Sequence, residues 1–289
     1  MSVKHPIIAV TGSSGAGTTT VKNAFEHIFR REDIVPAVIE GDSYHSYDRQ
    51  EMKTAIARYA ADGKTISHFG PEANLFDKLQ ETFAQYSETG LCKRRYYLHS
   101  DEEAESWEGL APGQFTPWQE IPKDTDLLFY EGLHGGVKTD TANVAELVDL
   151  LIGVVPIVNL EWIQKIHRDN AQRGYSADAI VDTILRRMDD YVRYVTPQFS
   201  RTHINFQRVP TVDTSNPFIA RDIPTPDESY IVIRFRNANQ TDFPYLLNMI
   251  HNSFMSRPNT IVIPGGKMGF AMEIILTPLI HEMIEKKRA

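Results

Sequence analysis

The chain is short of cysteine, of long apolar segments and of net positive charge. Cys92 is its only cysteine among 289 residues, so neither an intramolecular disulfide nor a thiol switch within the chain can form. The longest apolar stretch, residues 147–160, is interrupted by Asp149 and Pro156 and is too short to span a bilayer. A formal net charge of −8 argues against bulk binding to nucleic acid or to an anionic membrane.

Features that separate domains are also missing. The chain has no Pro/Gly/Ser-rich linker, no low-complexity tract and no internal repeat, and it is 42% hydrophobic and 24% charged, as ordinary globular proteins are. We therefore expect a single domain over residues 1–289. No secretory signal is visible before the first apolar run, and together with the single cysteine this predicts a cytoplasmic protein.

The most informative absence is that of one lysine. Residues 12–19 are Gly-Ser-Ser-Gly-Ala-Gly-Thr-Thr, which fits the phosphate-loop pattern G-x-x-x-x-G-K-[ST] except that Thr18 replaces the lysine. An apolar run at residues 6–11 precedes the loop and a helical apolar pattern at 21–31 follows it, so backbone N–H groups and a helix N-terminus face an anion. The alternative is a glycine-rich turn that binds nothing. The residues expected to bind ATP are Gly12, Ser13, Ser14, Gly15, Ala16, Gly17, Thr18 and Thr19, with Thr19 also at Mg²⁺.

The rest of the chain alternates between strand-like and helix-like segments. Several of the strand candidates are continuous apolar runs, as strands buried on both faces are. The order predicts an α/β fold with a mostly parallel or mixed sheet flanked by helices, and antiparallel strands toward the C-terminus. Residues 87–125 show little periodicity and should form a long excursion over the active-site edge. We expect strands at 35–40, 126–130, 150–158, 209–213, 230–235 and 260–263, and helices at 49–62, 72–86, 162–173, 177–194 and 270–286.

Acidic residues follow three of the expected strands, at the edge where ligands collect in parallel sheets. Asp42 lies just beyond Val38-Ile-Glu-Gly41 and can accept the proton of an attacking hydroxyl; a helix-capping role is the alternative. Glu131 ends an apolar strand, where phosphate-loop proteins hold Mg²⁺ indirectly or orient water. Asp213 stands among turn-forming residues and is expected to be structural, or at most close to adenine.

A basic helix is expected at residues 162–173. Lys165, Asp169 and Arg173 share one face at i, i+4 and i+8, Arg168 lies beside that face, and Gly174 ends the helix. One interpretation is an exposed helix with ordinary ion pairs. The other is a lid whose cations, Lys165 first, replace the missing loop lysine at the transferring phosphoryl group.

Further basic residues gather at His45, Arg49, residues 93–95 and His99. Arginine suits a phosphorylated substrate because its planar fork meets two phosphate oxygens. His45 lies one helical turn past Asp42, so both can face one cleft; a buried, hydrogen-bonded histidine is the alternative. A later group consists of Arg186, Arg187, Arg234, Arg236 and Arg257, for which surface pairs, subunit contacts or an effector site would all fit.

These motifs resemble the bacterial phosphoribulokinases. The similarity rests on the lysine-free loop, on Glu40-Gly-Asp-Ser-Tyr-His45 and Phe129-Tyr-Glu-Gly-Leu-His-Gly-Gly136, and on residues 159–169 and 212–218. It runs from Pro6 to about Ile280. The resemblance implies a phosphate-loop kinase fold and ATP- and Mg²⁺-dependent conversion of ribulose 5-phosphate to ribulose 1,5-bisphosphate.

The resemblance also implies roles for individual residues and a form of regulation. Bacterial members are typically homo-oligomers, often octamers, activated by NADH and inhibited by AMP. Plant-type members are switched by a disulfide, which one cysteine cannot form. The implied roles are catalysis for Asp42, Lys165 and Asp169, metal chemistry for Glu131, sugar-phosphate binding for His45, Arg49, Arg168 and Arg173, and regulation for Arg186, Arg187, Arg234 and Arg257. From its place among the basic residues, His99 is also expected to bind the substrate.

Two other functions compete with this one. Uridine-kinase-like enzymes share the strand–loop–helix start and an arginine-bearing lid, but they keep the loop lysine and their acceptor carries no phosphate. A nucleotide-sensing regulator could have kept the fold and bind ATP or NADH without turnover. Against it, the carboxylates at the strand ends and the lid sequence are intact.

Overall fold

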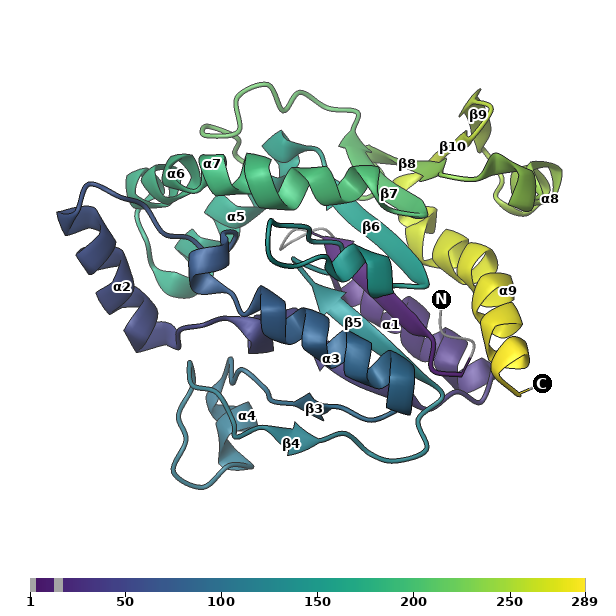
Figure 1. The fold of residues 1–289 in the computed structure, drawn as a ribbon. Coiled ribbons are helices and arrows are strands. Elements are labelled where there is room, and N and C mark those ends of the chain that lie inside the picture. Colours follow the sequence, from purple (N-terminus) through teal and green to yellow (C-terminus); the bar gives the residue numbers. More distant parts are fainter. Residues whose placement is uncertain (1–3, 13–17, 289) are drawn as a thin grey trace. The chain divides into compact units, whose positions relative to one another are not determined.

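A computed structural model describes residues 4–12 and 18–288 of the chain (Figure 1). Helices and strands alternate over much of its length. The strands are β1 (Ile7–Gly12), β2 (Pro36–Glu40), β3 (Lys93–Arg94), β4 (Gln119–Glu120), β5 (Leu127–Gly132), β6 (Leu150–Pro156), β7 (Ile204–Pro210), β8 (Ser229–Phe235), β9 (Phe254–Arg257) and β10 (Thr260–Pro264). The helices are α1 (Thr18–Arg31), α2 (Arg49–Ala61), α3 (Phe76–Thr89), α4 (Asp101–Glu105), α5 (Val158–Arg173), α6 (Ala177–Arg186), α7 (Met188–Asp190), α8 (Phe243–Met249) and α9 (Met268–Arg288).

The expected α/β fold with a mixed sheet is confirmed. An eight-stranded sheet has the order β2-β5-β1-β6-β7-β8-β10-β9. β2 pairs with β5 and β6 with β7 in parallel, whereas β8 pairs with β7 and β10 with both β8 and β9 in the antiparallel sense. The antiparallel strands therefore lie toward the C-terminus, as predicted. The chain divides into two compact units, and the expectation of one domain stays a prediction.

Unit 1 comprises Met1–Ala9, Val35–Asp149 and Arg186–Arg201. The registers of β2 and β5 place Glu40 opposite Glu131, so both strands end at the same edge. Burial of Phe83, Tyr86 and Tyr130 provides its core. The excursion at 87–125 contains α4 and a two-stranded sheet of β3 and β4.

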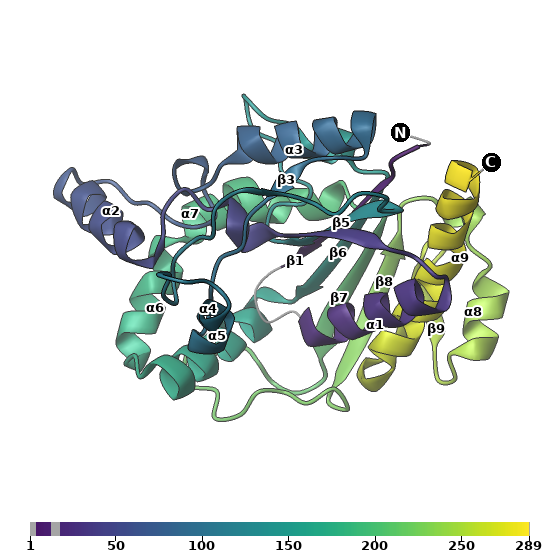
Figure 2. The same ribbon diagram turned by 90° about the horizontal axis from the view of Figure 1, so that it is seen from below.

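Unit 2 comprises Val10–Ile34, Leu150–Leu185 and Thr202–Ala289. Helix α1 lies beside α9 (Figures 1 and 2). His27 Nδ1 lies 3.1 Å from Glu273 Oε1, Arg31 donates to the Thr277 hydroxyl, and His281 Nδ1 lies 2.8 Å from a Glu32 carboxylate oxygen. Polar contacts therefore join the end of α1 and the residue after it to α9.

Most predicted elements are present, with shifts at their ends. The predicted strand at 209–213 is wrong in position, because β7 ends at Pro210. The predicted helix 177–194 is divided, since α6 ends at Arg186 and a π-helical turn, Tyr191–Val195, follows α7. Among the described residues no helix has both the length and the apolar character that crossing a bilayer requires.

Candidate active site

The expected phosphate loop begins where β1 ends. Gly12 is the last residue of β1, and a Cβ there would collide with the carbonyl oxygen of Val154, so this position requires glycine. Helix α1 starts at Thr18, which preserves the expected order of strand, loop and helix. Residues 13–17 lie outside the described residues, as do the side chains of Thr18 and Thr19.

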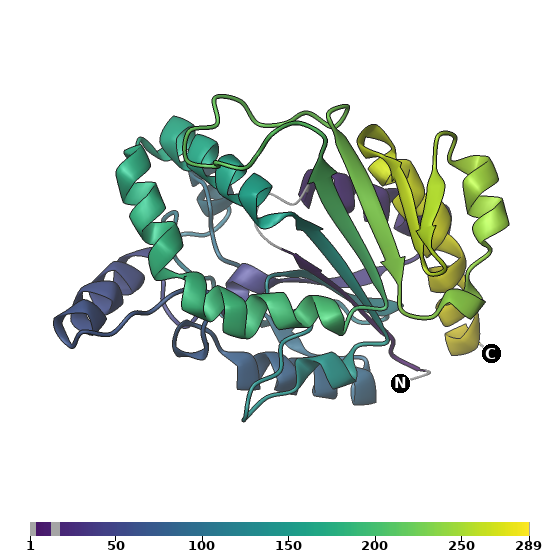
Figure 3. The ribbon, with the colours of Figure 1, turned by 90° about the horizontal axis from the view of Figure 1, so that it is seen from above.

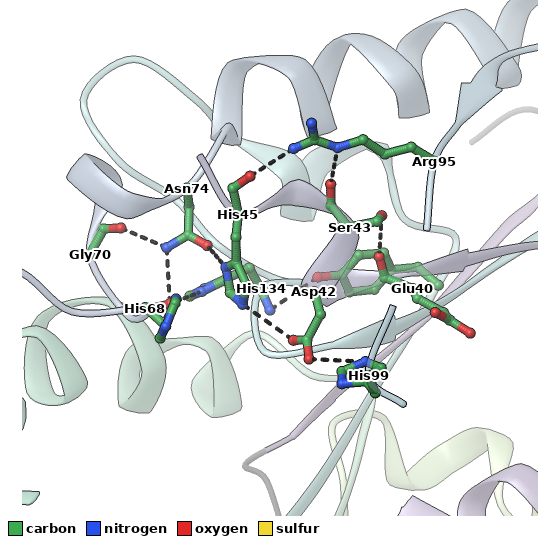
Figure 4. Close-up of polar contacts among 11 residues, drawn as sticks. Glu40, Asp42, Ser43, His45, His68, Gly70, Asn74, Arg95, His99 and His134 are labelled. Atoms are coloured by element: carbon green, nitrogen blue, oxygen red, sulfur yellow. Dashed lines mark hydrogen bonds and ion pairs between the residues drawn. The ribbon is translucent and has the colours of Figure 1, made fainter. Parts of the chain in front are cut away.

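Asp42 lies in a short 3-10 turn, Gly41–Tyr44, directly after β2. Its Oδ1 is 3.3 Å from His45 Nε2 and its Oδ2 is 3.7 Å from His99 Nε2 (Figure 4). The carboxylate is about half exposed, with 43% of its side chain accessible. The two predicted substrate-binding histidines thus converge on the predicted base.

Nearby imidazoles control the charge of Asp42. Burial alone would raise the pKa of this carboxyl, but the hydrogen bond and charge of His45, with the charge of His99, lower it to about 2. A carboxyl group with that pKa is ionised throughout the physiological range. Asp42 is therefore an anionic hydrogen-bond acceptor facing outward from the end of β2.

His45 is buried and is held from behind by an asparagine that the sequence analysis missed. His45 Nδ1 lies 2.8 Å from Asn74 Oδ1. The Asn74 amide nitrogen donates to the carbonyl oxygens of His68 at 2.9 Å and Gly70 at 2.7 Å (Figure 4). Asn74 lies just before α3, in a segment that the sequence predicted to be the first turn of that helix, and only its polarity among apolar neighbours could have drawn attention to it.

Two further histidines lie behind His45. The ring of His68 is 4.4 Å from that of His45, centroid to centroid. Burial, with the positive charges of His45 and Arg187, lowers the pKa of His68 to about 3. Burial lowers the pKa of His134 to about 4, although its hydrogen bond to the His68 carbonyl works in the opposite direction. Both are neutral at physiological pH, since burial disfavours their charged forms.

Arg49 and His99 belong to one local arrangement. Arg49 opens α2, and its guanidinium lies 3.4 Å from the His99 carbonyl oxygen. Its backbone N–H donates to Gly113 at 2.9 Å. Gly113 has φ +95°, and a Cβ there would lie 2.7 Å from that of Arg49. The excursion at 87–125 thus reaches Asp42 through His99 and borders Arg49 through Gly113.

The neighbouring arginines have a different role from the one expected. The sequence grouped Arg94 and Arg95 with phosphate-binding residues. Arg94 instead donates to the Val38 carbonyl at 3.0 Å, and Arg95 donates to the carbonyls of Ser43 and His45 at 2.7 Å each. The Arg95 guanidinium also lies over aromatic rings. These cations hold the backbone that carries Asp42.

Glu131 is partly exposed near the carboxyl end of β5. Gly41 and Gly132 approach so closely that a Cβ on Gly41 would lie 2.8 Å from the Gly132 Cα. Mg²⁺ usually keeps several waters and takes only one or two carboxylates together with substrate phosphates, so a single carboxylate here fits that ion. No group of three or more His, Cys, Asp or Glu side chains in residues 4–12 and 18–288 could hold a metal by itself.

Helix α5 carries the expected cations around a buried acid. Lys165 Nζ pairs with Asp169 Oδ2, and Arg168 Nε lies 3.0 Å from Asp169 Oδ1. Only 4% of the Asp169 side chain is exposed, so this is not the ordinary surface pairing that was the alternative. Burial would raise the pKa of Asp169, but the hydrogen bonds and charges of Lys165 and Arg168 lower it. Gly174 ends the helix with φ +66° as expected, and the Arg173 side chain lies outside the described part of the chain.

The loop after β7 covers one side of α5 (Figure 3). Trp162 stacks on Phe218 at 5.5 Å between ring centroids, and His167 Nε2 lies 3.0 Å from the Ala220 carbonyl oxygen. Asp213 accepts a hydrogen bond from the backbone of Ser215 at 2.8 Å, which is the turn geometry expected for a structural aspartate. The first three turns of α5 are therefore anchored within unit 2.

The four arginines considered for regulation divide between the units. Arg186 and Arg187 belong to unit 1, and the Arg187 guanidinium lies 6.0 Å from the centre of the Phe69 ring. Arg234 and Arg257 belong to unit 2, where both are aligned with Thr260 from opposite neighbouring strands. Each pair is close within its own unit.

Comparison with known proteins agrees with the resemblance found in the sequence. The model of the family described as "Phosphoribulokinase / Uridine kinase family" matches residues 7–215. A chromosomal phosphoribulokinase of Cupriavidus necator is 63% identical over 289 residues, covering 100% of this chain and 99% of that protein. A phosphoribulokinase of Nitrobacter vulgaris is 62% identical, covering 99% of this chain and 98% of that protein. The solved structure of a phosphoribulokinase from Rhodobacter spheroides matches with a TM-score of 0.92, 55% identity and 100% coverage of both chains.

Proposed function

This chain belongs to the phosphoribulokinase / uridine kinase family, and we propose that it transfers the γ-phosphoryl group of ATP to ribulose 5-phosphate. The products are ribulose 1,5-bisphosphate and ADP. Full-length relatives named phosphoribulokinase at about 60% identity support this activity over that of a uridine kinase. The observation that carries the proposal is the Asp42 carboxylate, ionised at the end of β2 between His45 and His99.

In the proposed reaction the acceptor hydroxyl at C1 donates a hydrogen bond to Asp42. The bond from that oxygen to Pγ forms as the bond from Pγ to the ADP oxygen breaks, and the hydroxyl proton passes to Asp42. A carboxyl with a pKa of about 2 is a weak base, so it orients the hydroxyl first and takes the proton late. That suits a loose transition state, in which the nucleophile needs little activation.

The remaining residues are proposed for binding and charge stabilisation. Histidine and arginine side chains around Asp42 suit the phosphate of the acceptor, because their N–H groups can meet its oxygens. Lys165 and Asp169 are proposed for catalysis, with the lysine offsetting charge on the transferring group. The assigned roles are ATP at residues 12–19, Mg²⁺ at Thr19 and Glu131, and sugar phosphate at His45, Arg49, His99, Arg168 and Arg173.

Regulation and assembly are proposed on the family resemblance. We infer that the protein is cytoplasmic and forms a homo-oligomer of up to eight subunits. We also infer that NADH activates it through the arginines at positions 186, 187, 234 and 257, which are Arg186, Arg187, Arg234 and Arg257. AMP would oppose this effect. Light scattering of the purified protein and initial rates with and without NADH test the two parts separately.

The deciding experiment is a coupled ADP-release assay with ATP and Mg²⁺. Ribulose 5-phosphate, ribose 5-phosphate and uridine are offered in turn, with an acceptor-free control. Turnover with ribulose 5-phosphate well above the other two is expected. Preference for uridine would favour a nucleoside kinase, and tight ATP binding with no release for any acceptor would favour a nucleotide sensor.

A further inference from the structure

The side chain of Asn74 has only one orientation that satisfies its neighbours. Its amide nitrogen lies within hydrogen-bond distance of two carbonyl oxygens, those of His68 and Gly70. Because a carbonyl accepts only, the nitrogen must face them and the amide oxygen must face His45. Asn74 is buried, so reversing the amide would set its oxygen against two carbonyl oxygens, with no hydrogen bond to either.

The backbone around Asn74 prevents the side chain from moving away. His45 and Asn74 form an isolated antiparallel bridge. Ser46 N–H donates to the Ala73 carbonyl at 2.9 Å, and Leu75 N–H donates to the Tyr44 carbonyl at 2.8 Å. The turn that carries Asp42 and the segment before α3 are thus joined on both sides of the His45–Asn74 pair.

The orientation of Asn74 determines where His45 carries its protons. An amide oxygen can only accept, so His45 Nδ1, at 2.8 Å, must carry a hydrogen. The opposite nitrogen, Nε2, faces the Asp42 carboxylate at 3.3 Å. A neutral imidazole carries one N–H, so with Nδ1 occupied it would direct a lone pair at an anion. Only the imidazolium donates in both directions.

We propose that Asn74 is a positioning residue for phosphoryl transfer: by accepting the Nδ1 proton of His45, it makes His45 present a second N–H to Asp42. This inference rests on the proposed kinase function. The Nε2–H of His45 donates to Oδ1 of Asp42. Oδ2, on the His99 side, then accepts the hydrogen bond of the acceptor hydroxyl. Without Asn74, His45 can adopt the neutral Nε2–H form, which still donates to Asp42 but carries no charge.

The basic groups packed around His45 are either neutral or directed away from Asp42. His68 and His134 are neutral because of burial, and Arg95 is directed at backbone carbonyls. His45 and His99 are thus the imidazoles placed to meet the Asp42 carboxylate. The titratable or charged groups that face this arrangement are Asp42, His68, His99, His134, Arg95 and Arg187.

The first test measures protons on His45 directly. In full-length protein labelled with ¹⁵N at histidine and assigned with a His45→Gln variant, both ring nitrogens of His45 should carry hydrogen at pH 7.5. An imine-type ¹⁵N signal from Nε2 at that pH overturns the proposal. The measurement needs no substrate, so it remains decisive even if the ADP-release assay shows that ribulose 5-phosphate is not the acceptor.

The second test separates the accepting oxygen of Asn74 from its donating nitrogen. Asn74→Ala removes both, whereas Asn74→Asp keeps an acceptor for His45 and loses the donors to residues 68 and 70. We expect Asn74→Ala to lower kcat about tenfold and to move the alkaline limb of the kcat profile about one pH unit toward acid. KM for ATP should not change, and Asn74→Asp should restore the alkaline limb.

Thr82→Ala is the matched control. The Thr82 hydroxyl accepts from Tyr44 at 2.9 Å beside the same turn and does not contact the His45 ring, so its loss destabilises the turn without changing the protons on His45. Equal effects of Asn74→Ala and Asn74→Asp, or the same acid shift in Thr82→Ala, would show that Asn74 is only structural. If neither Asn74 variant folds, the ¹⁵N measurement on the unaltered protein decides alone.

Discussion

Asp42 gains its properties from side chains on three different segments. The strand end and the 3-10 turn place the carboxylate, His45 lies one turn further on, and His99 comes from the excursion at 87–125. The low pKa of Asp42 is therefore a product of tertiary structure, because neither imidazole contacts it in an extended chain. Substitution at this residue should affect chemistry much more than folding.

We expect Asp42→Asn to lower kcat by about two to four orders of magnitude, because an amide cannot take the hydroxyl proton. Circular dichroism and thermal unfolding should stay close to those of the unaltered protein. Asp213→Asn is the control, since an asparagine oxygen can still accept from Ser215 in the same turn, and its kcat should be unchanged. Near-normal turnover in Asp42→Asn would remove Asp42 from the mechanism.

His134 should make stability depend on pH. Its pKa is about 4 in the folded chain and about 6.5 when unfolded. Between these values the unfolded chain binds a proton that the folded chain does not, so stability falls as pH drops. By pH 5 the cost is about 2 kcal/mol relative to neutral pH.

His134→Phe keeps the aromatic contact with Phe76 and removes the titration. Urea unfolding at pH 7 and pH 5 should therefore show a smaller acid loss in the variant than in the unaltered protein. An identical loss in both proteins would show that other groups cause the acid sensitivity.

Residues marked by their position after a strand could be selected from the sequence, whereas residues that act only through tertiary contacts could not. Asp42 lies just past the end of β2 and Glu131 near the end of β5, and parallel strands bring such ends to one edge. Asn74 and His68 belong to the site because both contact His45, which is 29 residues from Asn74 and 23 residues from His68 in the chain. No local pattern encodes those contacts. For the same reason Arg95 could not be distinguished from a phosphate ligand.

At the scale of elements, the contact between the excursion at 87–125 and α2 should affect binding of the acceptor. Gly109 and Gly113 both have positive φ, and a Cβ on Gly109 meets nothing within 4 Å whereas one on Gly113 meets Arg49. Each of the variants Gly109→Ala and Gly113→Ala should therefore introduce backbone strain of about 1–2 kcal/mol. Only the second displaces a proposed substrate-binding residue.

We expect Gly113→Ala to raise KM for ribulose 5-phosphate severalfold while KM for ATP stays constant. Gly109→Ala should leave both constants unchanged, because the space around its Cβ is open. Initial-rate kinetics on the two variants measure the difference. Equal KM changes in the pair would show that strain, and not the position of Arg49, is responsible.

A substitution on α5 tests whether Lys165 supplies the positive charge that a phosphate-loop lysine normally provides. Lys165→Met should lower kcat by about two to three orders of magnitude if the lysine stabilises the transferring group. It should also reduce stability, because buried Asp169 loses a cation. Lys22→Met breaks an exposed i,i+4 pair with Glu26 and should change neither property. Unaltered kcat and ATP affinity in Lys165→Met would exclude the relocation.

Elements with strong apolar patterns were predictable, and those shaped by turns were not. The buried run of β6 shows its strand directly, whereas β7 alternates from Ile204 and Phe206 into partly exposed residues and was placed too late. α3 starts at Phe76 and not at residue 72, because Pro71–Ala73 forms a 3-10 turn and Asn74 is extended to pair with His45. Short α8 and β9 offered too few residues for a periodic signal.

At the scale of the whole molecule, the two compact units share a strand. The first three residues of β1 belong to unit 1 and the last three to unit 2. Loss of either unit therefore removes half of β1. We predict one cooperative unfolding transition in differential scanning calorimetry, with equal calorimetric and van't Hoff enthalpies. Two separated transitions would contradict the proposed single domain.

The pairing of α1 with α9 has a consequence for biosynthesis. His27 and Glu273 are 246 residues apart, so the ribosome makes the helix behind the phosphate loop long before it makes the helix that covers it. Until α9 emerges, His27 and Arg31 at the end of α1 lack their contacts with Glu273 and Thr277. A transcript cut short anywhere before α9 would therefore yield a chain in which the helix after the phosphate loop lacks these contacts.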